Sequence, residues 1–376
     1  MFRRPPLVGH SLSFERNSMP ETRRPDRWVL PATLVAFTAL LFMLWRMEGL
    51  HMDKEALKYT GCAEQVLQGD LRDLLSNYLP YATYVLFLLP FVALGAPVLA
   101  IPVQIGLSVI AALALGRLTE RISGHRVTRQ LATALFLLSV PVQVWTLALY
   151  TESLFTTLTV LLTEQLLARD RPGRWTWPLV VLVLFARPVG LLFVGPLLIA
   201  GLGRKWPLSL RIAGYAGVLL LALLNPRVAR PQLDIIVNSD VLCGCTVDAD
   251  RMIDFHGHSV LDAQLHLIER NGLGRHLKLM GTRMASLFTF TRPSFSASHN
   301  LLLAGYFLLY PFALAGWWMF RRSTTIEAVG SVLLLHAILI ACTCDEWSGR
   351  FNAPLVPMLI MLVCPALVRL LQTARN

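Results

Sequence analysis

The stretch Trp28-Val-Leu-Pro-Ala-Thr-Leu-Val-Ala-Phe-Thr-Ala-Leu-Leu-Phe-Met-Leu-Trp45 decides the fold class, because its eighteen residues include no charged side chain. A helix that crosses the hydrocarbon core of a bilayer needs about 20 predominantly apolar residues. Similar apolar runs recur along the chain, and short segments that hold most of the arginines separate them. The pattern predicts an all-α membrane protein built as a polytopic helical bundle.

The composition of the whole chain agrees with this prediction. Apolar residues make up 55% of the 376 residues and charged residues only 15%, whereas a soluble domain carries about 25% charged residues. A soluble enzyme, a disordered tail and a compact nucleic-acid-binding domain are therefore excluded. The net charge of +11 could suggest a nucleic-acid partner, but the basic residues fall between long apolar runs and form no basic stripe on a soluble surface, so no nucleic-acid partner is predicted. The six cysteines are too few and too scattered for a disulfide scaffold.

The apolar runs predict about ten spans. One further stretch, Leu79–Leu94, contains two prolines and is interpreted as a juxtamembrane or re-entrant segment. Two short runs on either side of Arg187-Pro188 predict a hairpin with its tip at these residues. The predicted spans are 28–45, 97–116, 131–149, 153–168, 176–186, 188–201, 208–224, 301–320, 327–343 and 352–371.

The distribution of basic residues predicts the orientation. Cytoplasmic loops carry an excess of Lys and Arg, and this excess is largest when residues 1–27 lie inside. We therefore expect a cytoplasmic N-terminal tail, 1–27, and a single membrane domain, 28–376, with outer loops at 46–96 and 225–300. Both termini are expected in the cytoplasm, and the expected location is a bacterial inner membrane.

The first outer loop carries acids beside the membrane. Asp53 and Glu55 begin a predicted interfacial helix in which Asp53, Leu57 and Cys62 share one face. A carboxylate beside a membrane can act as a general base when partial burial raises its pKa. The alternative is a solvated start of a helix, where acids are common.

Two other outer turns carry charge. Tyr150-Thr-Glu152-Ser-Leu-Phe155 places one acid at the start of an apolar helix, where Thr151 or Ser153 could simply cap the helix. Asp345-Glu346-Trp-Ser-Gly-Arg350-Phe351 combines two acids and an arginine. This turn is interpreted either as a phosphate clamp or as an ordinary surface ion pair.

Arg187 interrupts apolar sequence, so it is expected either to face a cavity or an anion or to extend toward the membrane surface from a hairpin tip. In the long outer loop, residues Leu261–Phe290 predict one or two amphipathic helices. The same loop mixes Cys243, Cys245 and several histidines, but their spacing matches no zinc-ligand pattern, and no metal site is assigned.

Taken in order, the outer motifs resemble those of the GT-C superfamily of integral-membrane glycosyltransferases, and the Tyr150–Phe155 turn is similar to one in its mannosyltransferase branch. The motifs are Asp53…Tyr59…Gly69-Asp70, Asn77-Tyr78-Leu-Pro80-Tyr81, Thr151-Glu152-Ser-Leu-Phe155, Ala186-Arg187-Pro-Val-Gly190 and Glu346…Arg350-Phe351…Pro354…Pro357. The first loop departs from the family pattern, because Asp53-Lys-Glu55 replaces an adjacent acid pair.

The resemblance implies transfer of a sugar, with inversion, from a polyprenyl-phosphate donor to a lipid, glycan or protein acceptor at the outer or luminal membrane face. It implies that Asp53 is the base, that Glu152 orients the acceptor or the sugar, and that Arg187 and Arg350 hold the phosphate. It also implies a substrate-binding role for Glu55, Tyr78 and Glu346. A divalent cation, Mg²⁺ or Mn²⁺, held by Asp53 and Glu152 is left open.

Two other classes fit the composition. A secondary transporter or a flippase for lipid-linked sugars would need paired, interrupted helices in two related halves, and only Arg187-Pro188 interrupts a span strongly. A noncatalytic assembly subunit would leave the three acid-bearing turns without a purpose.

Overall fold

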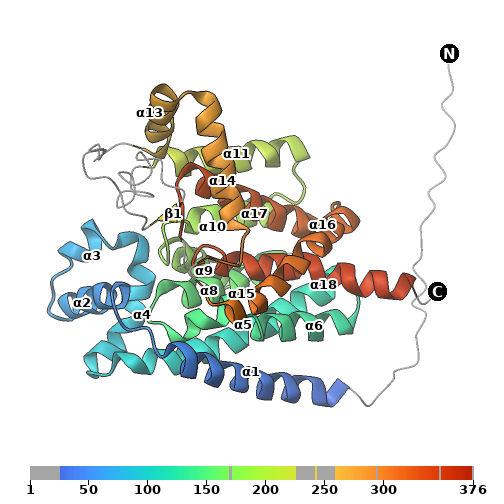
Figure 1. Cartoon of the computed structure of the whole chain (residues 1–376), viewed down its shortest axis with the longest axis horizontal. Coiled ribbons are helices and arrows are strands. Elements are labelled where there is room, and N and C mark those ends of the chain that lie inside the picture. Colours follow the sequence, from blue (N-terminus) through green and yellow to red (C-terminus); the bar gives the residue numbers. More distant parts are fainter. Residues whose placement is uncertain are drawn as a thin grey trace.

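The computed structural model describes residues 26–168, 172–225, 242–243, 259–293, 295–346 and 349–374, and these residues are almost entirely helical. Figure 1 shows α1, α5 and α18 running along the long axis of the molecule, with α13 and α14 on the side opposite α1. Strands β1 and β2 form one short parallel pair.

The α-helices are α1 (Asp26–Glu48), α2 (Glu55–Leu67), α3 (Arg72–Ser76), α4 (Ala82–Ala93), α5 (Ala100–Ser123), α6 (Arg126–Leu137), α7 (Val140–Gln143), α8 (Thr151–Leu167), α9 (Thr176–Leu184), α10 (Gly190–Leu202), α11 (Leu208–Leu224), α13 (Val260–Asn271), α14 (Leu273–Leu287), α15 (Ala297–Ala304), α16 (Leu309–Phe320), α17 (Thr324–Cys342) and α18 (Val356–Thr373). The 3-10 helices are η1 (Leu79–Tyr81), η2 (Pro97–Leu99), η3 (Val144–Leu147), η5 (Gly305–Leu308) and η6 (Ala353–Leu355), and the strands are β1 (Leu242–Cys243) and β2 (Asp345–Glu346).

The prediction of ten spans is wrong. Five segments in the described part of the chain are long and apolar enough to cross a membrane, or six if the bent pair Arg126–Leu137 and Val140–Leu147 counts as one span. The five are Trp28–Glu48, Pro97–Ser123, Ala297–Phe320, Thr324–Cys342 and Ala353–Thr373. The membrane prediction itself is supported, because α1 and α16 leave large apolar side chains such as Val35 (71% exposed) and Leu314 (69% exposed) facing outward.

The surplus predicted spans are helices that are short or buried inside the protein. Helix α8 has 17 residues, nearly all of them buried, and α9 has nine residues, which at about 1.5 Å per residue is well short of the hydrocarbon core. The run 131–149 is bent by 54° between α6 and α7. Hydropathy alone does not distinguish a helix surrounded by protein from one surrounded by lipid.

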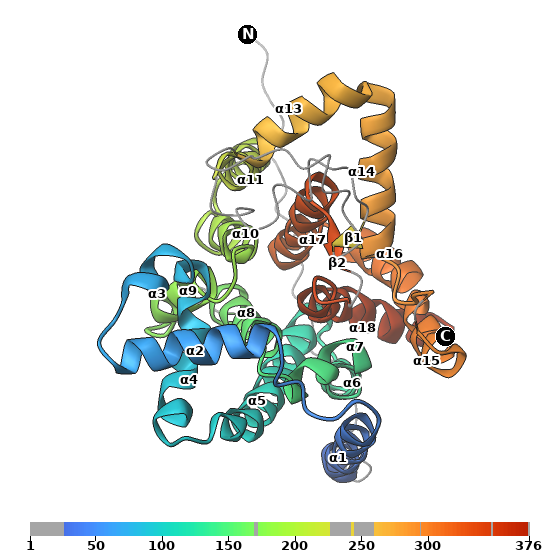
Figure 2. The same cartoon turned by 60° about the vertical axis from the view of Figure 1, so that its left-hand side comes forward.

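The core is centred on α5, α8, α10, α17 and α18 (Figure 2). Helix α5 packs against α6, α8 and α18, and α10 packs against α8 and α17. One close contact fixes the crossing of α16 and α18: a methyl group at Gly316 would lie 2.0 Å from the carbonyl oxygen of Leu362. Aromatic rings fill the centre, where Phe193 meets Phe155 edge-on at 5.0 Å.

The helix predicted in the loop 46–96 is confirmed as α2, but its predicted face is wrong. Helix α2 begins at Glu55, after Asp53, and it buries Ala56, Tyr59, Cys62 and Ala63, whereas Leu57 is 65% exposed. The small residues let α2 approach α4, and Tyr59 packs against three other tyrosines, Tyr78, Tyr81 and Tyr84. The predicted amphipathic segment is confirmed as two helices, α13 and α14.

Candidate functional site

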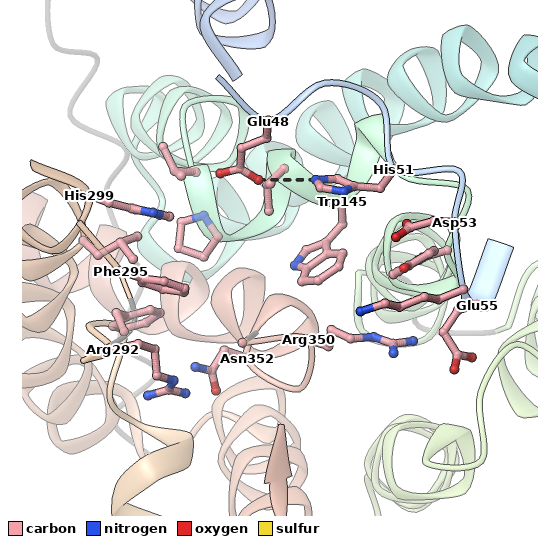
Figure 3. Close-up of a pocket in the computed structure, with 18 residues that line it drawn as sticks. Glu48, His51, Asp53, Glu55, Trp145, Arg292, Phe295, His299, Arg350 and Asn352 are labelled. Carbon is pink, nitrogen blue, oxygen red and sulfur yellow. Dashed lines mark hydrogen bonds and ion pairs between the residues drawn. The ribbon is translucent and has the colours of Figure 1, made fainter. Parts of the chain in front are cut away.

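A cavity of about 620 Å³ lies where four segments that are distant in sequence meet, residues 48–55, 140–150, 290–303 and 349–352. Its walls come from the end of α1 and the loop to α2, from α7 and η3, from Tyr150, from the segment before and within α15, and from the loop before η6. The lining residues are Glu48, His51, Asp53, Lys54, Glu55, Val140, Pro141, Val144, Trp145, Tyr150, Phe290, Arg292, Phe295, His299, Leu303, Gly349, Arg350 and Asn352. In Figure 3, Asp53, Glu55 and Arg350 appear on one side and Arg292, Phe295 and His299 on the other.

A backbone bridge explains how the loop between α1 and α2 reaches the cavity. The amide of His51 donates to the carbonyl of Leu147 at 3.1 Å, and the amide of Leu149 donates to the carbonyl of His51 at 3.0 Å. The side-chain amide of Gln104 on α5 holds the same segment through the carbonyl of Ala148 at 2.9 Å. Residues from two loops about 100 positions apart, Asp53 and Tyr150, therefore line one wall.

The loop is strained beside the acids. Lys54 lies between Asp53 and Glu55 with φ 45° and ψ −98°, and it is the only non-glycine residue with positive φ in the described part of the chain. Such backbone costs roughly 1–3 kcal/mol and tends to persist at functional sites.

Glu152 is the centre of the charge arrangement next to the cavity. Its carboxylate is fully buried at the start of α8. It accepts a hydrogen bond from Nε of Arg350, and Nη1 of Arg187 lies 3.4 Å from the same oxygen, Oε1. The three side chains carry two positive charges and one negative charge, and Arg350 is the member that lines the cavity.

The two arginines set the ionisation of Glu152. Burial raises the pKa of Glu152, but the charges of Arg350 and then Arg187 outweigh this effect, and the pKa lies below its ordinary value. Two rings hold the guanidinium groups in place: Cζ of Arg350 lies 5.0 Å from the ring centre of Tyr150, and Cζ of Arg187 lies 5.4 Å from that of Phe351. Glu152 is therefore an ionised anchor for two oriented guanidinium groups.

The side chain of Arg187 is buried in the protein, which does not fit an arginine that reaches solvent from a hairpin tip. It is 5% exposed, in the break between α9 and α10 that the hairpin prediction placed correctly. Thr83 holds the end of α9, since its amide donates to the carbonyl of Phe185 at 2.9 Å. A methyl group at Gly190 would lie 2.3 Å from the carbonyl oxygen of Val183, so the corner has no room for a side chain there.

The remaining predicted residues are placed as follows. Asp53, Glu55 and Arg350 line the cavity; Glu55 accepts from Lys58 at 2.8 Å, whereas Asp53 makes no ion pair with the described residues. Tyr78 lies in the tyrosine cluster of α2 and α4, with its ring 6.2 Å from that of Tyr59. Glu346 lies in β2, and its side chain is outside the described part of the structure.

A second buried ion pair stands at the other end of the cavity. Nη2 of Arg292 donates to Oδ2 of Asp345 at 3.0 Å, and the two side chains are 5% and 0% exposed. Asn300 braces the backbone of Arg292, accepting from its amide at 2.9 Å and donating to its carbonyl at 2.8 Å. Asp345 therefore has a buried partner that reasoning from the sequence missed.

Other cavity residues were also missed. Glu48 and His51 follow the first apolar run, and Asn352 follows Arg350-Phe351, so proximity to the predicted motifs was an available signal. Trp145, Arg292, Phe295 and His299 carry no such signal, because only the tertiary structure brings them to the cavity.

The described residues include no group of three or more His, Cys, Asp or Glu side chains that could hold a metal ion. Glu152 does not suit the shared Mg²⁺ or Mn²⁺ left open above, because two arginines already occupy its carboxylate. In the loop 225–300, most of the Cys- and His-containing part that precedes α13 lies outside the described residues. Within the described part, Cys344 is disulfide-bonded and Cys62, Cys342 and Cys364 are free.

Comparison of the chain with protein-family models, with curated proteins and with solved structures finds no match.

Proposed function

We propose that the protein is a membrane glycosyltransferase that moves a sugar from a polyprenyl-phosphate donor to a hydroxyl of a lipid, glycan or protein acceptor at the outer or luminal membrane face. One observation carries the proposal: a cavity-lining guanidinium, Arg350, is fixed by the buried Glu152, and the carboxylate of Asp53, which makes no ion pair within the described part of the chain, lines the same cavity.

Arg350 supplies the phosphate-binding group. Guanidinium matches phosphate oxygens through two parallel hydrogen bonds. Because Glu152 and the Tyr150 ring already hold Arg350, little reorganisation is needed when negative charge develops on the departing phosphate. The positive charge of Arg187, which pairs with Glu152, also stabilises the negative charge of the departing phosphate. We assign Glu152 a positioning role.

Asp53 supplies the base. The acceptor oxygen forms a bond to the anomeric carbon, the bond from this carbon to the phosphate oxygen breaks, and its electron pair leaves with the phosphate. The acceptor proton passes to the carboxylate of Asp53. Phosphate is a good leaving group, so the step requires no general acid, and attack opposite the leaving group inverts the anomeric carbon.

The apolar part of the cavity fits a lipid-borne substrate. His299 and Leu303 lie on the first turns of the candidate span Ala297–Phe320, and Leu301 on the same helix is 78% exposed to the surroundings. Each methylene of a polyprenyl chain contributes about 0.8 kcal/mol when it leaves water. Such a donor stays in the bilayer, and a site that borders a span can receive it there.

The test uses the full-length protein in phospholipid vesicles, with polyprenyl-phosphate mannose or polyprenyl-phosphate glucose carrying a tritiated sugar. Lipid and glycan extracts of the source membrane serve as acceptors. We expect the label to move to an acceptor, and we expect Asp53→Asn and Arg350→Ala to abolish this transfer. Asp70→Asn is the control, because Asp70 pairs with the exposed Arg72 outside the cavity lining.

Two results would overturn the proposal. Unchanged transfer in both cavity variants would remove the mechanism. Passage of the labelled lipid across the bilayer, without transfer of the sugar, would instead support a flippase or transporter.

A further inference from the structure

Glu48 and His51 form a pair at the rim of the cavity. Oε2 of Glu48 lies 3.4 Å from Nε2 of His51, and both residues line the cavity with Asp53 (Figure 3). Glu48 is the last residue of α1, and His51 lies three residues further along the chain. A carboxylate that contacts one imidazole nitrogen orients the ring and stabilises its protonated form.

The backbone of His51 is fixed more firmly than that of an ordinary surface loop. Hydrogen bonds to Leu147 and from Leu149 hold it on both sides. The end of α1 holds the preceding turn, where the amide of Gly49 donates to the carbonyl of Trp45 at 2.9 Å. These backbone hydrogen bonds hold the imidazole at the cavity wall. Its Nε2 lies toward Glu48, and its Nδ1 is the second atom that can bind a proton.

We propose that His51, oriented by Glu48, is the proton acceptor that regenerates Asp53 during glycosyl transfer. This inference rests on the proposed function. Asp53 takes the proton of the acceptor hydroxyl as the new glycosidic bond forms. The proton then passes to Nδ1 of His51, directly or through one water, while Nε2 keeps its proton and donates to Glu48. The imidazolium finally releases a proton to water at the rim.

The charges around the pair are consistent with this role. The hydrogen bond with Glu48 raises the pKa of His51 above 6.5. Burial lowers this pKa, and the negative charges of Glu48 and Asp53 raise it further. The other charged and titratable groups of the lining are Lys54, Glu55, Tyr150, Arg292, His299 and Arg350. A proton acceptor works best when its pKa is near the working pH, and the contact with the Glu48 carboxylate moves the pKa of His51 upward, toward neutral pH.

The first test needs no substrate. The nine histidines are labelled with ¹³C, the protein is titrated in detergent micelles, and the signal missing from His51→Gln identifies His51. We expect Glu48→Gln to move the His51 titration midpoint to lower pH. His125 is the control, because it lies between α5 and α6, outside the cavity lining, and its Nδ1 contacts the neutral side-chain amide of Gln372 at 3.3 Å, so Glu48→Gln should leave its signal unaffected.

The second test is the pH dependence of the transfer rate in the vesicle assay. We expect His51→Gln to lower the rate about 10- to 100-fold and to remove the histidine midpoint from the profile. We expect Glu48→Gln to shift that midpoint to lower pH, and His125→Gln to leave the profile unchanged.

The failures can be told apart. An unchanged rate and profile in His51→Gln, with transfer still abolished by Asp53→Asn, would overturn the relay and leave the proposed function standing. An unmoved His51 midpoint in Glu48→Gln would equally overturn the relay. Absence of transfer by the unmodified protein would overturn both proposals.

Discussion

Arg350 and Glu152 are 198 positions apart in the sequence and form an ion pair in which the carboxylate is fully buried and the arginine lines the cavity. Arg187 joins them from a third segment of the chain. Removal of one member of a buried ion pair leaves an uncompensated charge and costs far more than the net contribution of the intact pair. The three residues therefore connect the stability of the fold to the geometry of the candidate site.

We expect Glu152→Gln to lower the free energy of unfolding by about 3–5 kcal/mol, because two guanidinium groups would lose their shared counter-charge in a buried environment. The measurement is the thermal midpoint in detergent micelles. Glu64→Gln is the matched control, since Glu64 is exposed on α2, and it should change the midpoint little. Equal effects of the two substitutions would contradict a buried, paired Glu152.

The pair of His51 and Glu48 predicts a pH-dependent contribution to stability. The pKa of His51 is raised above 6.5 in the folded state, so the contribution is fully present below pH 6.5 and is lost as the pH rises through the raised pKa. The difference in thermal midpoint between the unmodified protein and His51→Gln should be larger near pH 5.5 than near pH 8.5. The effect is expected to be small, because the two side chains are 36% and 30% exposed. A difference in thermal midpoint that increases toward high pH would contradict the prediction.

The sequence predicted the helical membrane class and several cavity residues, because both depend on local features. Apolar runs identify helices. Acids or arginines in the short turns between them mark charged side chains whose burial costs free energy unless an opposite charge or a cavity accommodates them. The alternatives for Arg187 could not be resolved from the sequence, because the deciding fact is its contact with Glu152, a residue 35 positions away.

Two other features lay beyond sequence reasoning. The number of spans depends on which helices contact lipid: the sequence predicts a span at 153–168, yet α8 is buried among α5, α9 and α10. The other end of the cavity depends on Arg292 meeting Asp345, and neither residue has a periodicity or spacing that points to the other.

The strained Lys54 predicts a stabilising substitution. At φ 45° a residue with a Cβ atom is strained, whereas glycine is not. We expect Lys54→Gly to raise the free energy of unfolding by roughly 1 kcal/mol, since relief of strain exceeds the added entropy of the unfolded chain. Lys58→Gly, inside α2, should instead destabilise by about 1 kcal/mol. Thermal midpoints of both variants decide the prediction, and a loss of stability in Lys54→Gly would contradict it.

Gly190 predicts a destabilising substitution that acts on the position of Arg187. A methyl group there would lie 2.3 Å from the carbonyl oxygen of Val183 and 3.0 Å from the backbone of Leu184. Backbone atoms cannot move aside as a flexible side chain can, so Gly190→Ala must push α10 away from the end of α9. We expect a loss of about 1–3 kcal/mol.

Gly217→Ala is the matched control for Gly190→Ala, because Gly217 is also helical and a methyl group there meets nothing within 4 Å. It should be neutral or stabilising, since alanine has the higher helix propensity. In the vesicle assay, Gly190→Ala should also weaken transfer more than Gly217→Ala, because Arg187 lies three residues before Gly190, and its carbonyl accepts from the Gly190 amide at 2.9 Å. Equal stability of the two alanine variants would show that the turn between α9 and α10 accommodates a side chain without loss of stability. That result would contradict the proposal that this turn fixes the position of Arg187.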